Sequence, residues 1–138
     1  MTNNPSKSPS KSTSKRRNLV ILLHGWPDSW ILWLAVCHQI PAALTSESTL
    51  VALDLPGLGG SDGLYQCGAT EMMEALVKFI LGMREIYLRT EGDGSLDSEG
   101  KVLLVAHDWG ALCGFKLAAE APQLADRYIL ANSPLARI

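Results

Sequence analysis

The chain has 138 residues, of which 47% are apolar and 19% are charged, and its formal net charge is -2. This balance predicts one soluble globular domain with a real core, and it gives no support for a nucleic-acid partner. No apolar run approaches the roughly 20 residues that a membrane-spanning helix requires. The three cysteines (Cys37, Cys67 and Cys113) have no metal-ligand spacing. Their odd number is typical of reduced thiols and favours a cytoplasmic location, and we expect neither a metal nor a cofactor.

Residues 1–17 differ in composition from the rest of the chain. They are rich in Ser, Lys, Pro and Asn and contain five basic residues and no acidic one. Such a segment buries too little apolar surface to compensate for the conformational entropy that is lost on ordering, so we predict a disordered basic tail. A nuclear-localisation role for Lys15, Arg16 and Arg17 is the alternative to a solvated tail. The folded domain is predicted over residues 18–138.

Four short apolar segments predict β-strands that are buried on both faces. They are residues 19–23, 50–55, 102–107 and 127–131. Each is too short for an isolated helix, and each is followed by residues that break a strand.

Segments with helical patterns alternate with these strands. The first predicted helix begins near Trp30 and ends before Pro41, and the second has Thr70 as its N-cap. The apolar stripe of the second helix consists of Met72, Leu76, Phe79, Ile80, Met83 and Tyr87. The third helix runs from Trp109 towards Pro122, and its predicted packing residues are Leu112, Phe115, Leu117 and Ala119. The alternation predicts an α/β fold, a three-layer sandwich in which a parallel sheet has helices on both faces.

Three turns follow predicted strands and therefore meet at one edge of the sheet. They are residues 24–27, 57–60 and 108–110. In parallel sheets, reactive residues gather at the carboxyl ends of the strands. Asp108 lies in the third turn, between the small residues Ala106 and Gly110, which a nucleophile elbow requires. The same residue could instead be a simple helix N-cap.

The motifs in and around these turns resemble those of the α/β-hydrolase fold, in its epoxide hydrolase-like branch. They are HGWPDSW at 24–30, QIPAAL at 39–44, DLPGLGGSD at 54–62 and HDWGA at 107–111. The resemblance implies that Asp108 is a nucleophile that forms a covalent ester with an epoxide carbon. It also implies that the N–H groups of Trp109 and Trp26 form the oxyanion hole, and that Pro27 follows a cis peptide bond.

The resemblance assigns supporting roles to the neighbouring residues. His24 is expected to form structural hydrogen bonds, and His107 and Gly110 to shape the elbow, while Gly25 shapes the oxyanion turn. The implied substrate is a small apolar epoxide, which is hydrolysed to a diol. Dehalogenases of haloalkanes and haloacids share the Asp elbow and are the alternative. Many of them carry a polar halide ligand where this chain has Trp26, which favours epoxides.

The family also has parts that this sequence does not contain. After the strand that corresponds to residues 127–131, the family has a lid with tyrosines, and then an acid and a histidine. The chain stops at Ile138, so we expect an incomplete α/β-hydrolase fold that is weakly active or inactive alone. A third hypothesis is a catalytically dead fragment with only a binding role. The open edge of such a sheet also predicts self-association.

Overall fold

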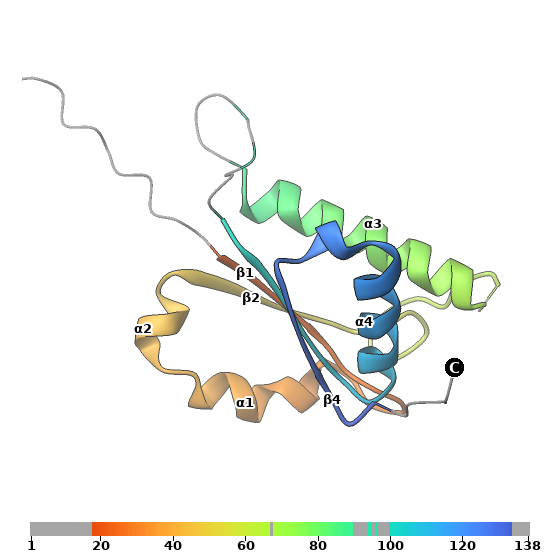
Figure 1. The fold of residues 1–138 in the computed structure, drawn as a ribbon. Coiled ribbons are helices and arrows are strands. Elements are labelled where there is room, and N and C mark those ends of the chain that lie inside the picture. The colour runs from red at the N-terminus through yellow and green to blue at the C-terminus, as the bar shows by residue number, and fades with distance from the viewer. Residues whose placement is uncertain (1–17, 67, 90–93, 95, 97–99, 134–138) are drawn as a thin grey trace, which may run out of the picture.

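A four-stranded parallel sheet forms the centre of the structure (Figure 1). Its strands are β1 (Asn18–Leu23), β2 (Ser48–Leu53), β3 (Val102–His107) and β4 (Arg127–Ala131), arranged in the order β2-β1-β3-β4. All three pairings are parallel, as the alternation of strands and helices predicted. The computed structural model describes residues 18–66, 68–89, 94, 96 and 100–133. The tail predicted over residues 1–17 lies outside the described residues.

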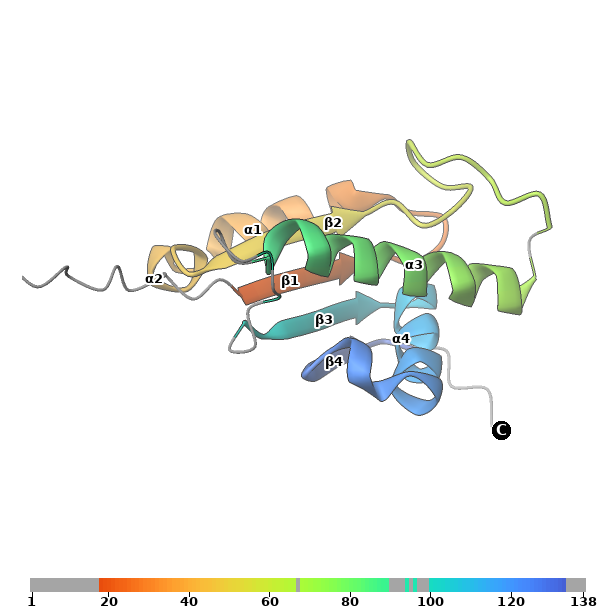
Figure 2. The same ribbon diagram turned by 90° about the horizontal axis from the view of Figure 1, so that it is seen from above.

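Helices cover both faces of this sheet, so the predicted three-layer arrangement is confirmed (Figures 1 and 2). The 3₁₀ helix η1 (Trp30–Trp33), with α1 (Leu34–Gln39) and α2 (Ala42–Thr45), lies on one face. The other face carries α3 (Ala69–Tyr87) and α4 (Trp109–Glu120). A short 3₁₀ helix, η2 (Pro122–Leu124), leads into β4.

The main core lies between the sheet and the pair α3 and α4. Alternate residues of β1 and β3 point to this side and meet side chains of the two helices. The fully buried members are Leu19, Ile21, Leu23, Leu104, Ala106, Leu76, Ile80, Ala111 and Leu117. Since burial of one large aliphatic side chain contributes about 1.5 to 3 kcal/mol, this side of the sheet supplies most of the hydrophobic stabilisation.

The opposite face is covered less completely. Leu22 of β1 and Trp33 of η1 are buried there. On the edge strand β4, by contrast, Ile129 is 53% exposed. Among the described residues, the helices on this face therefore cover the β2 and β1 side of the sheet better than the β4 side.

The predicted packing face of α4 is wrong for three of its four residues. Leu117 is buried, but Leu112, Phe115 and Ala119 are exposed. Small residues face the sheet instead, and Gly114 is the clearest example: a Cβ at this position would lie 2.5 Å from Cδ2 of Leu130. The helix lies so close to the sheet that only small side chains fit between them, and apolar periodicity does not reveal this closeness.

Two element boundaries also differ from the prediction. The N-cap of α3 is Gly68, whose carbonyl accepts the N–H of Met72 at 3.1 Å, and Thr70 lies inside the first turn. Strand β2 ends at Leu53 instead of residue 55, because the N–H of Leu55 donates to the His24 side chain and not to a neighbouring strand. Across the ranges that the structure describes, no helix has the length and apolar character needed to cross a membrane.

Candidate active site

Asp108 is the residue that joins β3 to α4. Its backbone has φ 54° and ψ -121°, a conformation that a residue with a side chain adopts only under strain. Its N–H donates to the carbonyl oxygen of Ala131 at 3.0 Å, and its own carbonyl accepts the N–H of Ala111 at 3.0 Å. The elbow is thus held by strand β4 on one side and by the first turn of α4 on the other.

Small residues allow this tight turn, as the sequence predicted. Gly110 lies against the end of β1, and a Cβ on it would lie 2.7 Å from the carbonyl oxygen of Leu23. Ala106 is completely buried two residues before Asp108. Larger side chains at these two positions would separate α4 from the sheet and move the elbow.

The loop after β1 approaches the elbow directly. The N–H of Trp26 donates to Oδ2 of Asp108 at 3.1 Å. Gly25 lies so close that a Cβ on it would be 2.5 Å from the Asp108 Cβ. The Trp26–Pro27 peptide bond is cis, which confirms that expectation. Residues 82 positions apart in sequence therefore meet at one carboxylate.

The surroundings of Asp108 favour its ionised form. The backbone N–H of Trp109 is the largest influence that holds the pKa of this carboxyl below its ordinary value, and the hydrogen bond from Trp26 is the next. Partial desolvation acts in the opposite direction, and the nearby His107 lowers the pKa further. The carboxylate is therefore charged at neutral pH, as nucleophilic attack requires.

His24 is a buried structural residue in this arrangement, which agrees with the expectation from sequence. The N–H of Leu55 donates to its Nε2 at 2.9 Å, so Nε2 carries no proton. Nδ1 then carries the proton and donates to the carbonyl oxygen of Gly25 at 2.6 Å. Because the ring is neutral in this tautomer, the 3.6 Å contact between Nε2 and Asp54 is not an ion pair. His24 thus joins the loops that follow β1 and β2.

A second carboxylate, Asp54, organises the loop after β2. Its Oδ1 accepts the N–H of Trp30 at 2.6 Å, and its Oδ2 accepts the N–H of Gly60 at 2.8 Å. Its backbone carbonyl accepts the hydroxyl of Ser61 at 2.7 Å. Desolvation raises the pKa of Asp54, but the hydrogen bonds from Gly60 and Trp30 outweigh it and leave the pKa below its ordinary value.

Asn132 is the residue at this site that the sequence analysis missed. It directly follows β4, has φ 51°, and its Nδ2 lies 3.1 Å from Nε2 of His107. The side chain at the end of β4 therefore contacts the residue that precedes Asp108. The signal was present in the sequence, since Asn is among the few residues that tolerate this backbone region at the end of a strand.

All the residues predicted for the site lie at the carboxyl ends of β1 and β3. They are Asp108, Trp109, Trp26, His24, Gly25, Pro27, His107 and Gly110. Asp108 and the Trp26 N–H are in direct contact, whereas His24 is buried beneath the loops. Among the described residues, no group of three or more potential metal ligands occurs.

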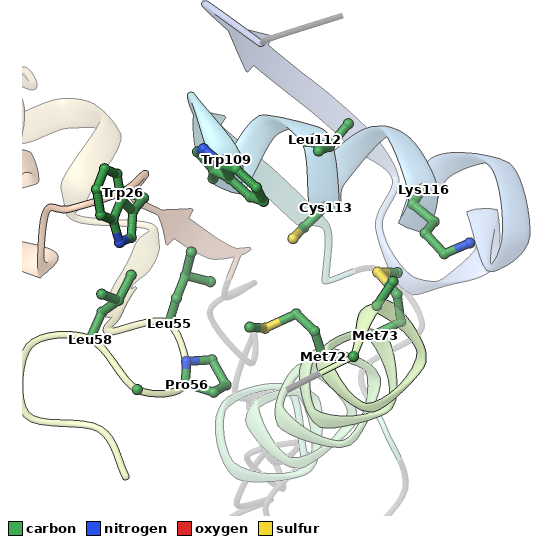
Figure 3. A pocket seen from close by; sticks show the side chains of 13 residues that line it. Trp26, Leu55, Pro56, Leu58, Met72, Met73, Trp109, Leu112, Cys113 and Lys116 are labelled. Atoms are coloured by element: carbon green, nitrogen blue, oxygen red, sulfur yellow. The ribbon is translucent and has the colours of Figure 1, made fainter. Parts of the chain in front are cut away.

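A pocket of about 710 Å³ lies beside the elbow, between α3, α4 and the loops that follow β1 and β2 (Figure 3). The side chains of Trp26 and Trp109, the two residues whose N–H groups approach Asp108, line it on one side. Its other lining residues are Leu55, Pro56, Gly57, Leu58, Gly68, Ala69, Met72, Met73, Leu112, Cys113 and Lys116. A volume in this range is typical of small-molecule sites.

The sequence model of the α/β hydrolase fold family matches residues 18–137. The chain belongs to the α/β hydrolase fold family. The described residues of this chain form a parallel sheet and a strand-to-helix elbow of this family's fold.

Several proteins that are similar to this chain are epoxide hydrolases. Epoxide hydrolase 4 of Mus musculus is 34% identical over 118 residues, which cover 84% of this chain and 28% of the relative. Epoxide hydrolase B of Mycobacterium tuberculosis is 37% identical over 95 residues, which cover 67% of this chain and 22% of the relative. The crystal structure of epoxide hydrolase VrEH1 from Vigna radiata matches with a TM-score of 0.60 and 29% identity, over 82% of this chain and 31% of that one. The chain thus spans less than a third of these proteins.

Proposed function

We propose that this chain carries the nucleophile and the oxyanion hole of an epoxide hydrolase-type reaction. Asp108 is the proposed nucleophile, and the N–H groups of Trp26 and Trp109 are the proposed donors to the oxyanion. One observation carries the proposal: a carboxylate on a strained turn, with φ 54°, accepts a backbone N–H from a second strand-end loop at 3.1 Å. The epoxide hydrolase relatives support the choice of substrate class.

In the first step, Oδ1 of Asp108 attacks a ring carbon of the epoxide. A bond forms between Oδ1 and this carbon, and the bond between the carbon and the epoxide oxygen breaks. The oxygen stays bonded to the other ring carbon as an alkoxide and takes up a proton from solvent water. Oδ2 is engaged by the Trp26 N–H, which leaves Oδ1 as the attacking atom. The lowered pKa of Asp108 supports this role because the attacking carboxylate is charged.

In the second step, water adds to Cγ of Asp108 in the ester. Negative charge then develops on Oδ2, next to the N–H groups of Trp26 and Trp109, which stabilise it. When this intermediate collapses, the diol leaves with the oxygen that had attacked and with one proton of the water. The other proton goes to solvent, and the carboxylate is regenerated. Because Trp26 already contacts Oδ2 before the reaction, little reorganisation is needed as this charge develops.

The test is covalent labelling of the 138-residue chain with styrene oxide, followed by intact-mass measurement. The expected result is one adduct that hydroxylamine removes, since hydroxylamine cleaves an ester but not a thioether on a cysteine. Asp108→Asn should lose this adduct by a factor on the order of 10⁴ or more, whereas Asp28→Asn, an exposed carboxylate in the loop after β1, should keep it. A folded wild-type chain that gives no hydroxylamine-sensitive adduct would overturn the proposal.

A parallel reaction with 1-bromobutane separates the two substrate classes. An ester from the bromoalkane with release of bromide, but none from the epoxide, would assign the chain to the dehalogenase type. A location in the cytoplasm and self-association through the open sheet edge stay predictions that accompany the proposal. Sedimentation at increasing protein concentration tests self-association.

A further inference from the structure

Strands β3 and β4 leave the sheet at the same level and with the same unusual backbone. Their register pairs His107 with Ala131, so the next two residues outward are Asp108 and Asn132. Both have a positive φ, 54° and 51°, and among the described residues no other residue with a side chain does. Such a conformation persists only where the surrounding structure holds it. Two neighbouring strand ends that adopt it side by side therefore indicate a shared restraint.

Two contacts join these strand ends. The N–H of Asp108 donates to the carbonyl oxygen of Ala131 at 3.0 Å. Beside this bond, Nδ2 of Asn132 lies 3.1 Å from Nε2 of His107. An amide NH₂ group only donates, so Nε2 is the acceptor and the proton of the ring is on Nδ1. The amide of Asn132 thus fixes both the orientation and the tautomer of the His107 ring.

We propose that Asn132 and His107 are positioning residues for the nucleophile, and that the contact between their side chains holds Asp108 in its reactive orientation. The inference rests on the proposed function and adds two residues to it. His107 precedes Asp108 in the chain, so a backbone change that swings the imidazole away from Asn132 also turns the peptide unit before the strained residue. The carboxylate would then move away from the Trp26 N–H, which donates to it at 3.1 Å.

The same contact controls the charge beside the nucleophile. Attack on the epoxide neutralises the carboxylate of Asp108, so a positive neighbour stabilises the reactant more than the transition state and slows the step. The charged form of His107 would be such a neighbour, since it lowers the pKa of Asp108. Nδ2 of Asn132 can donate to Nε2 only while Nε2 is unprotonated, so the contact and a neutral ring occur together. The pair thus keeps the carboxylate reactive as well as oriented.

The first experiment follows the geometry without any chemistry, by NMR at about pH 8, where an ordinary histidine is neutral. The nitrogen shifts of the His107 ring identify the nitrogen that carries the proton, and the amide proton shift of Trp26 reports its hydrogen bond to Asp108. Asn132→Gly removes the side-chain amide and keeps the positive φ, which glycine tolerates, so the fold should survive. In this variant the ring proton should move from Nδ1 towards Nε2, and the Trp26 amide proton should move upfield.

A matched pair of substitutions at His107 tests the contact itself. The side-chain amide of His107→Gln reaches the position of Nε2 and can accept from Asn132, whereas that of His107→Asn reaches only the position of Nδ1. Saturating styrene oxide should label Asp108 at close to the wild-type rate in His107→Gln. His107→Asn should label about fivefold more slowly, which is the typical effect of one hydrogen bond.

The concentration of styrene oxide that gives half of the maximal rate should stay unchanged in both variants, because His107 does not line the pocket. A general loss of structure would change both the rate and this concentration. His38→Asn, at an exposed position of α1, is the control and should label like the wild type.

The two positioning residues should act as one unit. Asn132→Gly should also label about fivefold more slowly, and the double variant with His107→Asn should label no more slowly than either single variant. Effects that multiply in the double variant would overturn the inference, because the two side chains would then act independently.

The two readouts separate failure of this inference from failure of the proposed function. An unmoved Trp26 amide signal in Asn132→Gly, or labelling of this variant at the wild-type rate, would overturn the positioning role and leave Asp108 as the nucleophile. A wild-type chain that forms no ester, but whose Trp26 signal moves in Asn132→Gly, would remove the proposed reaction and support the link from Asn132 to the elbow. The expected outcome is a moved signal together with slower labelling.

Discussion

Asp108 and Asp54 occupy comparable positions at strand ends, but the surroundings of their carboxylates differ. Each directly follows a parallel strand, each interacts with backbone N–H groups from another part of the chain, and each has a lowered pKa. Asp54, with its side chain only 12% exposed, has both oxygens engaged by N–H groups of two different segments. Asp108 is held at Oδ2 by Trp26 and lies beside an open pocket.

A glycine lies against each of these carboxylates. Gly59 packs on Asp54 with φ 54°, and Gly25 packs on Asp108 with an ordinary backbone. The positive φ is therefore on the glycine beside Asp54, where it causes no strain, but on the aspartate itself at Asp108, where it does. The carboxylate that serves structure has a relaxed backbone and binds N–H groups of two other segments, whereas the one proposed for chemistry has a strained backbone and lies beside an open pocket.

The largest expected effect on stability is beside Asp54. Gly59→Ala should lower the free energy of unfolding by about 3 kcal/mol, because it combines a left-handed backbone with a Cβ 2.6 Å from Asp54 Oδ1. Urea denaturation measures this change. Gly63→Ala is the control, since nothing lies within 4 Å of its added Cβ. Similar losses for the two variants would show that the packing around Asp54 does not hold the loop.

Gly25→Ala tests the other carboxylate. The added Cβ would lie 2.5 Å from the Asp108 Cβ, so the loop must move and the hydrogen bond from Trp26 should be lost. Covalent labelling by styrene oxide should fall by roughly 100-fold, since a shift of about 1 Å in a reacting group has that effect. Gly82→Ala, in open space on α3, should label at the wild-type rate. Undiminished labelling of Gly25→Ala would mean that the Trp26 contact is dispensable.

The pH dependence of the free energy of unfolding should differ between the wild type and Asp54→Asn. Asp54→Asn should lower the free energy of unfolding by about 2 kcal/mol at neutral pH. The amide NH₂ would then face a backbone N–H whose hydrogen bond the carboxylate accepts. Since the folded pKa lies below the ordinary value of 3.8, the stabilisation is complete above that value and is lost as the pH falls through the folded pKa. The difference between the two proteins in urea should therefore be constant from pH 7 to about pH 5 and shrink below pH 3.8. Asp62→Asn, at an exposed position of the same loop, should match the wild type throughout. A difference that grows on acidification would contradict this.

The smallest effect, of opposite sign, is expected at the elbow. Asp108→Gly should raise the melting temperature by roughly 3 to 6 °C, because glycine adopts a positive φ without strain. Asp108→Ala keeps the strained backbone and removes the carboxylate, so it should melt close to the wild type. If the glycine variant melts no higher than the alanine variant, the elbow is not strained and the contrast with Asp54 weakens.

The sequence was sufficient to predict the sheet and the position of the elbow. Strands buried on both faces are continuous apolar runs, so β1 and β3 were predicted almost to the residue. The meeting of residues 24–27 with Asp108 followed from parallel topology, because carboxyl ends of parallel strands lie at one edge. The specific pairing of the Trp26 N–H with Asp108 was implied by the resemblance to the α/β-hydrolase fold and not by topology.

What could not be predicted depends on how closely elements approach each other. The buried side of α4 carries Gly110, Ala111 and Gly114, which hydropathy alone does not identify as the packing face. Asn132 was missed because its contact with His107 joins two strand ends 25 residues apart. The pocket was also missed, since Met72 and Cys113 belong to different helices whose relative placement is a tertiary property.

The hydrogen bond from the Asp108 N–H to the Ala131 carbonyl, at 3.0 Å, links the elbow to strand β4. In the sheet formed by the described residues, β4 pairs only with β3, so its other edge is unpaired. Amide hydrogen exchange at Asp108 therefore reports how often the edge strand detaches. Any contact that stabilises β4 at its unpaired edge also slows the opening of the turn that holds the proposed nucleophile.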